Sequence, residues 1–241
     1  VVYGGVSPEH EVAVITALQV MNALKAGGYM VLPVYISKEG NWFLGGNEYL
    51  KPETYKDLVK VERLGKRVIL SPDRDYGLLT KGWLGFGNAE VQPEVIFPVI
   101  HGKGGEDGTL QGLFELANIP YVGCGVTASA VKIDKYLAKK IAASLGIKVL
   151  GDQLVVRGEE MKLSKMNYPV FVKPVSLGSS IGLTRVEKES ELTDALEVAF
   201  CYDDRAMIEE AIIDPKEVNV SILGNNPYEL SLTEQPVASG E

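Results

Sequence analysis

The first 36 residues alternate between two apolar segments and one helical pattern. Residues 1–3 (VVY) and 31–36 (VLPVYI) have the character of strands, and an amphipathic helix is predicted between them. A strand, helix, strand order predicts a right-handed crossover between parallel strands. Residues 95–100 (VIFPVI) supply a further buried strand that leads into the amphipathic segment 109–116. We therefore expect a doubly wound α/β front part, whereas residues 37–94 hold turn signals and two short amphipathic pieces and carry no recognisable chemistry.

Local signals limit the first helix. The pair Gly4–Gly5 predicts a tight turn, after which Ser7 is a suitable N-cap with Pro8 at the first helical position. Glycines 27 and 28 predict the end of the helix. Apolar residues recur three and four positions apart, which predicts one buried face. That face would contain Val14, Ile15, Leu18 and Met21.

The pattern changes from about residue 126. A helix is expected over Ala128–Leu145, ended by Gly146, and β-rich segments follow it. The expected strands are residues 153–156, 168–172, 207–210 and 218–223. The chain as a whole is therefore expected to combine α/β and α+β parts.

Composition narrows the class of protein. The chain has 241 residues with 32 acidic and 24 basic side chains, a formal charge of -8, which makes nucleic acid an unsuitable partner. Cys124 and Cys201 lack metal-ligand spacing, so we expect two buried, reduced thiols and a cytoplasmic protein. No apolar run reaches the roughly 18 residues needed to cross a bilayer, so no membrane association is expected. The chain begins without Met, and we expect it to be part of a longer reading frame.

A serine- and glycine-rich loop at residues 177–182 (LGSSIG) follows a predicted strand that ends in Lys173. Backbone amides, hydroxyls and a lysine are the groups that bind phosphate. The order of a Walker loop is absent. A hairpin turn beside a surface lysine is the competing interpretation.

A second glycine-rich loop, residues 101–108 (HGKGGEDG), follows the strand at 95–100. Open parallel sheets bind ligands at the carboxyl ends of their strands, so this position indicates a site. The glycine spacing does not match the dinucleotide fingerprint. His101 could equally be a hydrogen-bonded packing residue.

Several single carboxylates and lysines have two interpretations each. Glu9 could have no role beyond complementing the helix dipole. Alternatively, it could pair with an ammonium group of a substrate. Its neighbour His10 is interpreted as a capping-turn residue. Glu209, Glu210 and Glu217 could be solvated charges, or they could line a strand end that reads a purine and its ribose. Lys135 is a surface lysine by default.

Four sequence blocks follow one another in a fixed order: residues 4–12 (GGVSPEHEV), 101–112 (HGKGGEDGTLQG), 132–135 (KIDK) and 172–182 (VKPVSLGSSIG). Together they resemble the signatures of the D-alanine:D-alanine ligase family of the ATP-grasp superfamily, through essentially the whole chain. The resemblance implies an ATP-grasp fold and an ATP-dependent ligase that forms D-alanyl-D-alanine for peptidoglycan precursors through an acyl phosphate.

The resemblance also implies how the nucleotide is held. Lys135 and Lys173 match lysines that hold the ATP phosphates, and Ser180 matches a loop residue that closes on them. The adenine and ribose contacts are matched by Glu209, the main chain at Glu210 and Ile212, and Glu217.

The amino-acid side of the site is implied in the same way. Glu9 matches the carboxylate that holds the ammonium of the first D-alanine, and Ser179 matches the hydroxyl beside it, so these two are the catalytic candidates. Val12 belongs to the same substrate-binding motif. His101 matches a residue near the second substrate.

The chain also departs from the family pattern. The turn 214–216 (DPK) is one residue longer than usual before Glu217, and Glu210 stands where a Lys is frequent. The family's loop tyrosine, its phosphoryl-stabilising arginine and the ligands of two Mg²⁺ or Mn²⁺ ions would lie beyond Glu241. We therefore expect no metal ligand and no turnover within residues 1–241 alone.

The implied architecture has three parts: an N-terminal doubly wound domain at 1–123, a central lid at 124–206 and the start of a C-terminal domain at 207–241. A homodimer is expected from the family. A D-alanine:D-lactate or D-alanine:D-serine ligase is the nearest alternative, since it shares all four blocks. A nucleotide-binding module without turnover is the alternative from another class.

Overall fold

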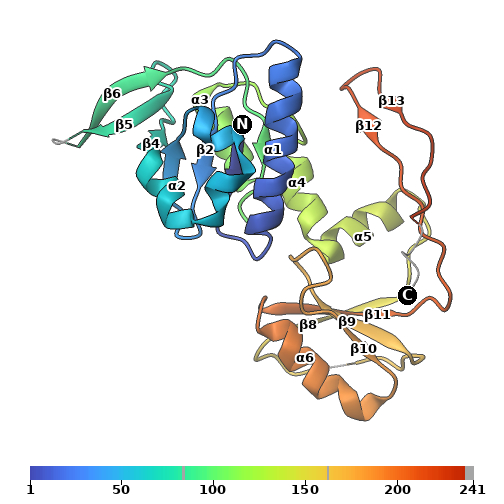
Figure 1. Ribbon diagram of the computed structural model, residues 1–241. Helices are drawn as coiled ribbons and strands as arrows, with labels where there is room; N and C mark the ends of the chain where they lie inside the picture. Colours follow the sequence, from blue (N-terminus) through green and yellow to red (C-terminus); the bar gives the residue numbers. More distant parts are fainter. Residues whose placement is uncertain (83–84, 162, 237–241) are drawn as a thin grey trace.

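The computed structural model describes residues 1–82, 85–161 and 163–236, and it contains two main β-sheets joined by a pair of helices (Figure 1). The last five residues of the expected third domain, 237–241, lie outside the described residues. No helix in the described ranges combines the length and the apolar character needed to cross a bilayer.

The first sheet has the strand order β6-β5-β4-β3-β2-β1-β7. Strand β1 (Val2–Gly4) pairs in parallel with β2 (Val34–Ile36) and with β7 (Pro98–Val99). Helix α1 (His10–Ala26) follows β1, and α3 (Thr109–Ala117) follows β7. The expected parallel crossover is therefore confirmed.

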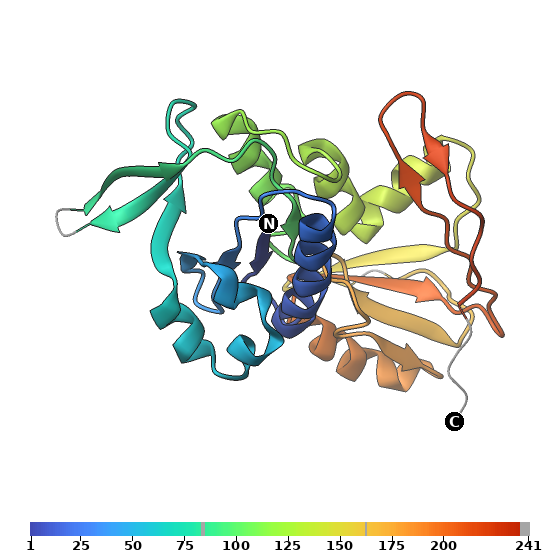
Figure 2. The same ribbon diagram turned by 45° about the horizontal axis from the view of Figure 1, so that its top comes forward.

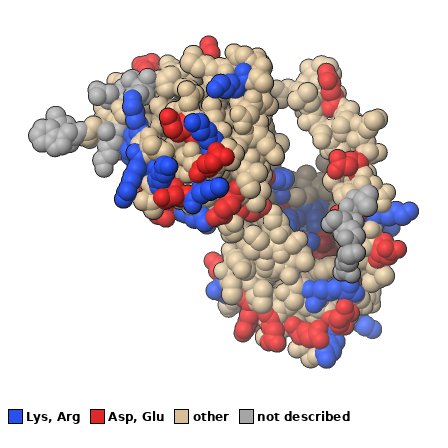
Figure 3. Space-filling view, in the orientation of Figure 1, with Lys and Arg blue, Asp and Glu red and all other residues tan. Residues whose placement is uncertain are grey.

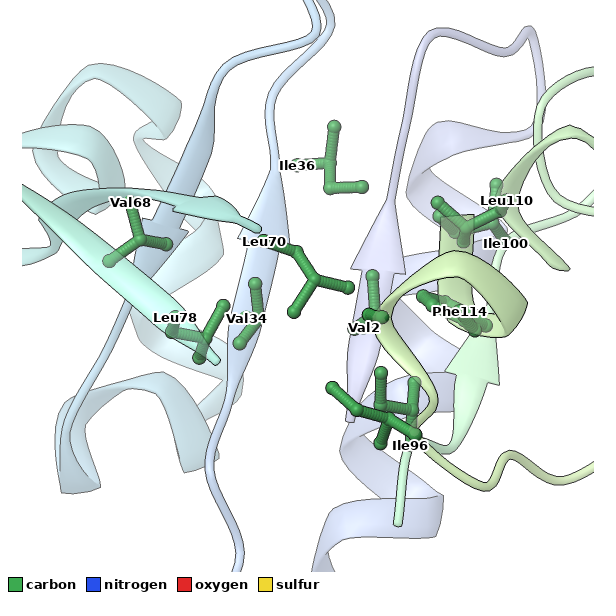
Figure 4. Close-up of a cluster of buried hydrophobic side chains, with 12 residues drawn as sticks. Val2, Val34, Ile36, Val68, Leu70, Leu78, Ile96, Ile100, Leu110 and Phe114 are labelled. Carbon is green, nitrogen blue, oxygen red and sulfur yellow. The ribbon is translucent and has the colours of Figure 1, made fainter. Parts of the chain in front are cut away.

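Alternation along the strands places the two helices on opposite faces of this sheet. Val2 packs in one core cluster with Phe114 of α3 (Figure 4), and the next residue, Tyr3, packs in a second cluster with Met21 of α1. Successive strand residues point to opposite faces. The sheet is thus covered on both sides, as the doubly wound prediction requires.

Four antiparallel strands extend this sheet through the stretch for which the sequence predicted only turns and short amphipathic pieces. Each pairs with its neighbour in the chain. The elements are β3 (Trp42–Leu44), η1 (Asn47–Leu50), η2 (Pro52–Lys56), α2 (Leu58–Leu64), β4 (Lys66–Leu70), β5 (Leu78–Gly82) and β6 (Gly85–Val91). The strand expected at 31–36 forms only from Val34, directly after Pro33, which has no N–H to contribute to a ladder.

Helix α1 begins later than predicted. Ser7 and Pro8 lie in a turn, where the Ser7 hydroxyl accepts a hydrogen bond from the Glu9 amide (3.1 Å), and Glu9 itself occupies the N-cap position. The stripe of buried residues was predicted correctly except at Ile15, which is 59% exposed. The helix ends at Gly27 as expected.

Two helices occupy the segment that was predicted as one. Helix α4 (Val126–Ile133) and helix α5 (Lys135–Ser144) are separated at Asp134, whose backbone is extended. The Asp134 carboxylate accepts from the Leu137 amide (2.8 Å) and from Arg205 (2.7 Å), so it caps the second helix and fixes the break. The prediction of a continuous helix was therefore wrong.

The second sheet is antiparallel, in the order β10-β9-β11-β8, and α6 (Leu192–Phe200) packs against it. Its strands are β8 (Asp152–Val156), β9 (Val170–Pro174), β10 (Thr184–Val186) and β11 (Arg205–Glu210), with η3 (Glu189–Glu191) before α6. Strand β11 runs through the boundary expected at residue 206 and bonds to both β8 and β9. The domain limits at 123 and 206 stay a prediction, and the sheet groups residues 207–210 with the central part.

The C-terminal arm, residues 211–234, leaves β11 and carries the short hairpin of β12 (Ile222–Leu223) and β13 (Glu229–Leu230). It stands away from both sheets in the two ribbon views (Figures 1 and 2). The strand expected at 218–223 is present only at its end. Cys124 and Cys201 are free and exposed, so the expectation of buried thiols was wrong.

Candidate active site

A glycine turn brings Glu9 to the carboxyl end of β1. Gly4 and Gly5 have φ values of +90° and +94°, and a Cβ atom on Gly4 would lie 2.3 Å from the Ile36 carbonyl oxygen. Only glycine fits such a conformation and such a close approach. The turn therefore sets Glu9 at the edge of the parallel sheet where ligands bind in folds of this class.

The side chain of His10 supports this turn. Its ring is fully buried, Nδ1 donates to the Gly5 carbonyl (2.8 Å), and Nε2 accepts from the Tyr35 hydroxyl (3.0 Å). His10 is the first residue of α1, and its ring supports the turn before the helix, in keeping with its interpretation as a capping-turn residue. No signal in the sequence pairs His10 with Tyr35, because His10 lies on helix α1 and Tyr35 lies on strand β2.

The loop 101–108 folds over Glu9. A Cβ atom on Gly102 would lie 3.4 Å from Glu9 Oε2. Hydrogen bonds within the loop stabilise it, because the Asp107 carboxylate accepts from the amides of Gly104 (2.7 Å) and Thr109 (2.9 Å). Burial opposes ionisation of Asp107, but these hydrogen bonds outweigh it and lower its pKa.

His101 stands at the start of that loop, directly after the buried Ile100. Its Nε2 atom is buried and has no hydrogen-bond partner among the described residues. A buried, unpartnered ring nitrogen is unusual in a packing histidine. The observation therefore favours the substrate-facing interpretation of His101 over the packing one.

The serine loop reaches Glu9 from the other sheet. Ser179 donates a hydrogen bond to the Glu9 carboxylate although 170 positions separate the two residues in the sequence. Ser179 and Ser180 have φ values of 52° and 56°, a left-handed conformation that is uncommon outside glycine and is frequent at functional sites. The serine loop thus contacts the start of α1, although the two segments are far apart in the sequence.

Lys135 lies at the base of the same loop. It is the first residue of α5, its amide donates to the Val175 carbonyl (3.1 Å), and its ammonium group contacts the Leu177 carbonyl. Burial and the nearby charge of Lys173 lower the pKa of Lys135. A partly desolvated lysine beside a second cation is a position that an anion would stabilise.

Lys173 and Glu209 form an ion pair between neighbouring strands. Lys139, which the sequence did not single out, contacts the other carboxylate oxygen of Glu209 and lies 3.4 Å from Asp152. Figure 3 shows basic side chains at the floor of the hollow below the C-terminal arm. The site thus combines a group of lysines with a carboxylate at one end.

The remaining candidates lie at the edge of this arrangement. The Glu210 amide is already bonded to the Gly151 carbonyl (3.2 Å), and Ile212 is 54% exposed just after β11. Glu217 is exposed on the C-terminal arm, and Val12 is exposed in the first turn of α1. Within the described ranges, no hydrogen bond or ion pair joins Val12, Ile212 or Glu217 to the lysines or to Ser179.

Arg205 is a further residue that sequence reasoning missed. It bonds to Asp134 at the start of α5, and Asp203 accepts from the amides of Ser176 (2.8 Å) and Arg205 (3.0 Å). These bonds attach both the start of α5, where Lys135 lies, and the segment before the serine loop to the start of β11. No group of three or more His, Cys, Asp or Glu in the described part of the chain is arranged to hold a metal ion.

The arrangement suits one kind of chemistry. Cations and loop amides can stabilise a polyphosphate, a carboxylate beside a serine hydroxyl can hold an ammonium group, and the two lie at opposite ends of one short loop. Phosphoryl transfer depends mainly on such positioning and charge stabilisation.

Comparison with known proteins gives a consistent result. Two family models match: D-ala D-ala ligase N-terminus over residues 1–124 and D-ala D-ala ligase C-terminus over residues 145–241. The chain is 39% identical over 252 aligned positions to the D-alanine–D-alanine ligase of Thermoanaerobacter sp. (strain X514), covering all of this chain and 67% of that protein. The corresponding enzyme of Enterococcus hirae is 37% identical, with 95% of this chain and 64% of that protein covered.

Solved structures agree with this result. The D-alanine-D-alanine ligase from Helicobacter pylori superposes with a TM-score of 0.84 at 30% identity, covering 98% of this chain and 70% of that one. The VanG D-Ala:D-Ser ligase from Enterococcus faecalis gives 0.82 at 31% identity, with 97% and 68% covered. The chain thus spans about two thirds of the length of the relatives that it matches.

Proposed function

Since the chain belongs to the D-alanine–D-alanine ligase family, we propose that it carries the nucleotide and first-substrate sites of an ATP-dependent ligase that joins two D-alanine molecules. The single observation that carries this proposal is the bond from Ser179 to Glu9, because it brings the serine loop of one sheet onto the helix start of the other. The product is D-alanyl-D-alanine, which is used in peptidoglycan precursors.

The first chemical step needs an aligned nucleophile and a stabilised phosphate. The carboxylate of the first D-alanine attacks the γ-phosphorus of ATP, the bond to the β,γ-bridging oxygen breaks, and ADP leaves. We assign the ammonium of this D-alanine to Glu9 and Ser179, and the ATP phosphates to Lys135, Lys173 and the loop at Ser180. The grouping of two lysines supports this assignment, since the terminal phosphates are polyanionic.

The second step forms the peptide bond. The amine of the second D-alanine attacks the acyl phosphate carbonyl, phosphate leaves, and the nitrogen releases a proton. We place His101 near this amino acid, because its Nε2 is buried without a partner among the described residues, and Val12 near the first one.

The base and the sugar of ATP would lie at the end of β11. We assign the adenine to Glu209, which would accept from its amino group, and to the main chain at Glu210 and Ile212, and we assign the ribose to Glu217. Glu217 has the weakest support, because the contacts of the described residues do not connect it to the lysines.

Divalent cations complete the proposed reaction. Mg²⁺ or Mn²⁺ ions, when bound, would supply positive charge that offsets the charge of the phosphates. The described residues contain no suitable group of ligands, so no step is assigned to a metal here. We further propose a cytoplasmic homodimer, as the family resemblance implies.

The second substrate has an alternative. The similarity to a D-Ala:D-Ser ligase, at a TM-score of 0.82, supports D-serine as an alternative second substrate. D-lactate is an alternative from the sequence resemblance alone. The blocks described above are shared by all three activities, so specificity has to be measured.

Phosphate release by the full-length protein tests the proposal. With ATP, Mg²⁺ and D-alanine we expect phosphate and dipeptide, and with L-alanine we expect neither. Addition of D-lactate or D-serine identifies the second substrate by the mass of the product. Phosphate release that is independent of any D-amino acid would contradict the proposal.

A further inference from the structure

Strand pairing places two carboxylates side by side at the end of β11. Glu209 lies directly opposite Asp152 on β8. Directly opposed like charges destabilise a sheet. Lys139 contacts both carboxylates, and it lies one helical turn after Lys135 on the same face of α5.

Glu209 is held from its other side by Lys173. Lys173 lies on β9, opposite Met207 of β11 and therefore diagonal to Glu209. Its ammonium group contacts the carboxylate oxygen of Glu209 that Lys139 does not contact. Each oxygen of Glu209 therefore has one lysine partner. A carboxylate has about four lone-pair sites, so acceptor capacity remains on both oxygens.

The pair of lysines keeps Glu209 ionised in a partly buried position. The side chains of Lys139, Glu209 and Lys173 are 14%, 13% and 17% exposed. Burial alone would raise the pKa of Glu209, but the hydrogen bonds and charges of the two lysines outweigh it and lower that pKa. An ionised carboxylate only accepts hydrogen bonds.

We propose that Lys139 is a positioning residue that fixes Glu209 as an acceptor, so that the site selects a purine with a 6-amino group over one with a 6-oxo group. This inference rests on the proposed function, in which Glu209 faces the adenine. A 6-amino group donates to the carboxylate, whereas a 6-oxo group offers a second acceptor and is repelled.

A purely structural role is the competing explanation. In that case Lys139 would only offset the repulsion between Asp152 and Glu209, and its loss would lower stability without changing nucleotide selection. Lys140 provides a matched control, because it pairs with Asp152 (3.1 Å) from the more exposed side, and this ion pair does not involve Glu209.

The test compares the Kd values of ATP and inosine triphosphate, which differ at position 6 of the purine, for the full-length protein with Mg²⁺. For Lys139→Met we expect the ratio of the two Kd values to shrink about tenfold, the scale of one charge-assisted hydrogen bond. Lys139→Arg should keep most of the ratio, and Lys140→Met should leave it unchanged.

Two further measurements make the outcome decisive. Glu209→Gln should reduce the discrimination at least as much as Lys139→Met does, because an amide can present either a donor or an acceptor to position 6. If Glu209→Gln leaves the ratio unchanged, the proposed role of Glu209 fails. If Glu209→Gln reduces the ratio and Lys139→Met does not, only the role of Lys139 is overturned. Thermal unfolding shows that each variant is folded, and Lys139→Gln replaces Lys139→Met if the latter does not fold.

Discussion

Ser179 donates a hydrogen bond to the carboxylate of Glu9, and this bond joins the loop after β9 to the start of α1. Together the two residues place a carboxylate, a hydroxyl and the serine loop within one site, with Lys135 at the base of that loop.

Glu9→Gln should raise the KM for D-alanine while leaving the KM for ATP nearly unchanged. The substitution removes the charge that would hold the substrate ammonium, and loss of a charged hydrogen bond corresponds to roughly ten- to one hundredfold in affinity. Glu11→Gln is the matched control, because Glu11 is exposed on the same helix and pairs with Lys38 instead. Equal effects of the two substitutions on D-alanine would rule out the role of Glu9.

Gly105→Ala should destabilise the protein much more than Gly104→Ala. A Cβ atom on Gly105 would lie 2.3 Å from the Ile100 carbonyl oxygen, so the backbone of the loop must move, at a cost of about 3 kcal/mol or more. Gly104 has a φ of +85° and open space around it, so its substitution should cost only about 1–2 kcal/mol of backbone strain. Urea unfolding measures both, and similar losses would contradict the packing described for this loop.

His10→Ala should lower the free energy of unfolding by about 2–4 kcal/mol, because it leaves a cavity and removes the partners of the Gly5 carbonyl and the Tyr35 hydroxyl. Tyr35→Phe removes only one of these bonds and should cost roughly 1 kcal/mol. A His10→Ala protein as stable as wild type would show that the histidine does not support the turn.

Stability should depend on pH through Glu209. Its pKa in the folded protein is lowered from an ordinary value of 4.5 by Lys139 and Lys173, against the effect of burial. The ionised group therefore stabilises the fold above pH 4.5, and this contribution is lost as the pH falls through the lowered pKa. The stability difference between wild type and Glu209→Gln should shrink over that acidic range. A difference that stays constant there would contradict the ion pairs.

Local patterns predicted the elements that depend on neighbouring residues. The spacing of Val14, Leu18 and Met21 identified the buried face of α1, and the apolar segments identified β1, β2 and β7. The prediction that Ile15 is buried was wrong, because this residue falls just outside that face. A spacing of three and four residues does not resolve this difference.

Features set by distant partners could not be predicted in this way. The break at Asp134 depends on Arg205, and the orientation of Glu209 depends on Lys139, so each involves contacts between residues on different elements. The antiparallel extension through β3 to β6 was missed for a different reason, since its strands pair with their neighbours in the chain and the turn signals between them hid the pattern. The candidate site residues come from the resemblance, and the physical connections among them come from the fold.

The most direct measurement is a crystal structure of the full-length protein with a non-hydrolysable ATP analogue, Mg²⁺ and D-alanine. We expect the ammonium of D-alanine within hydrogen-bond distance of Glu9, the phosphates beside Lys135 and Lys173, and the substrate carboxylate facing the γ-phosphate. Nucleotide and amino acid bound at separate places, or phosphates remote from both lysines, would contradict a shared site.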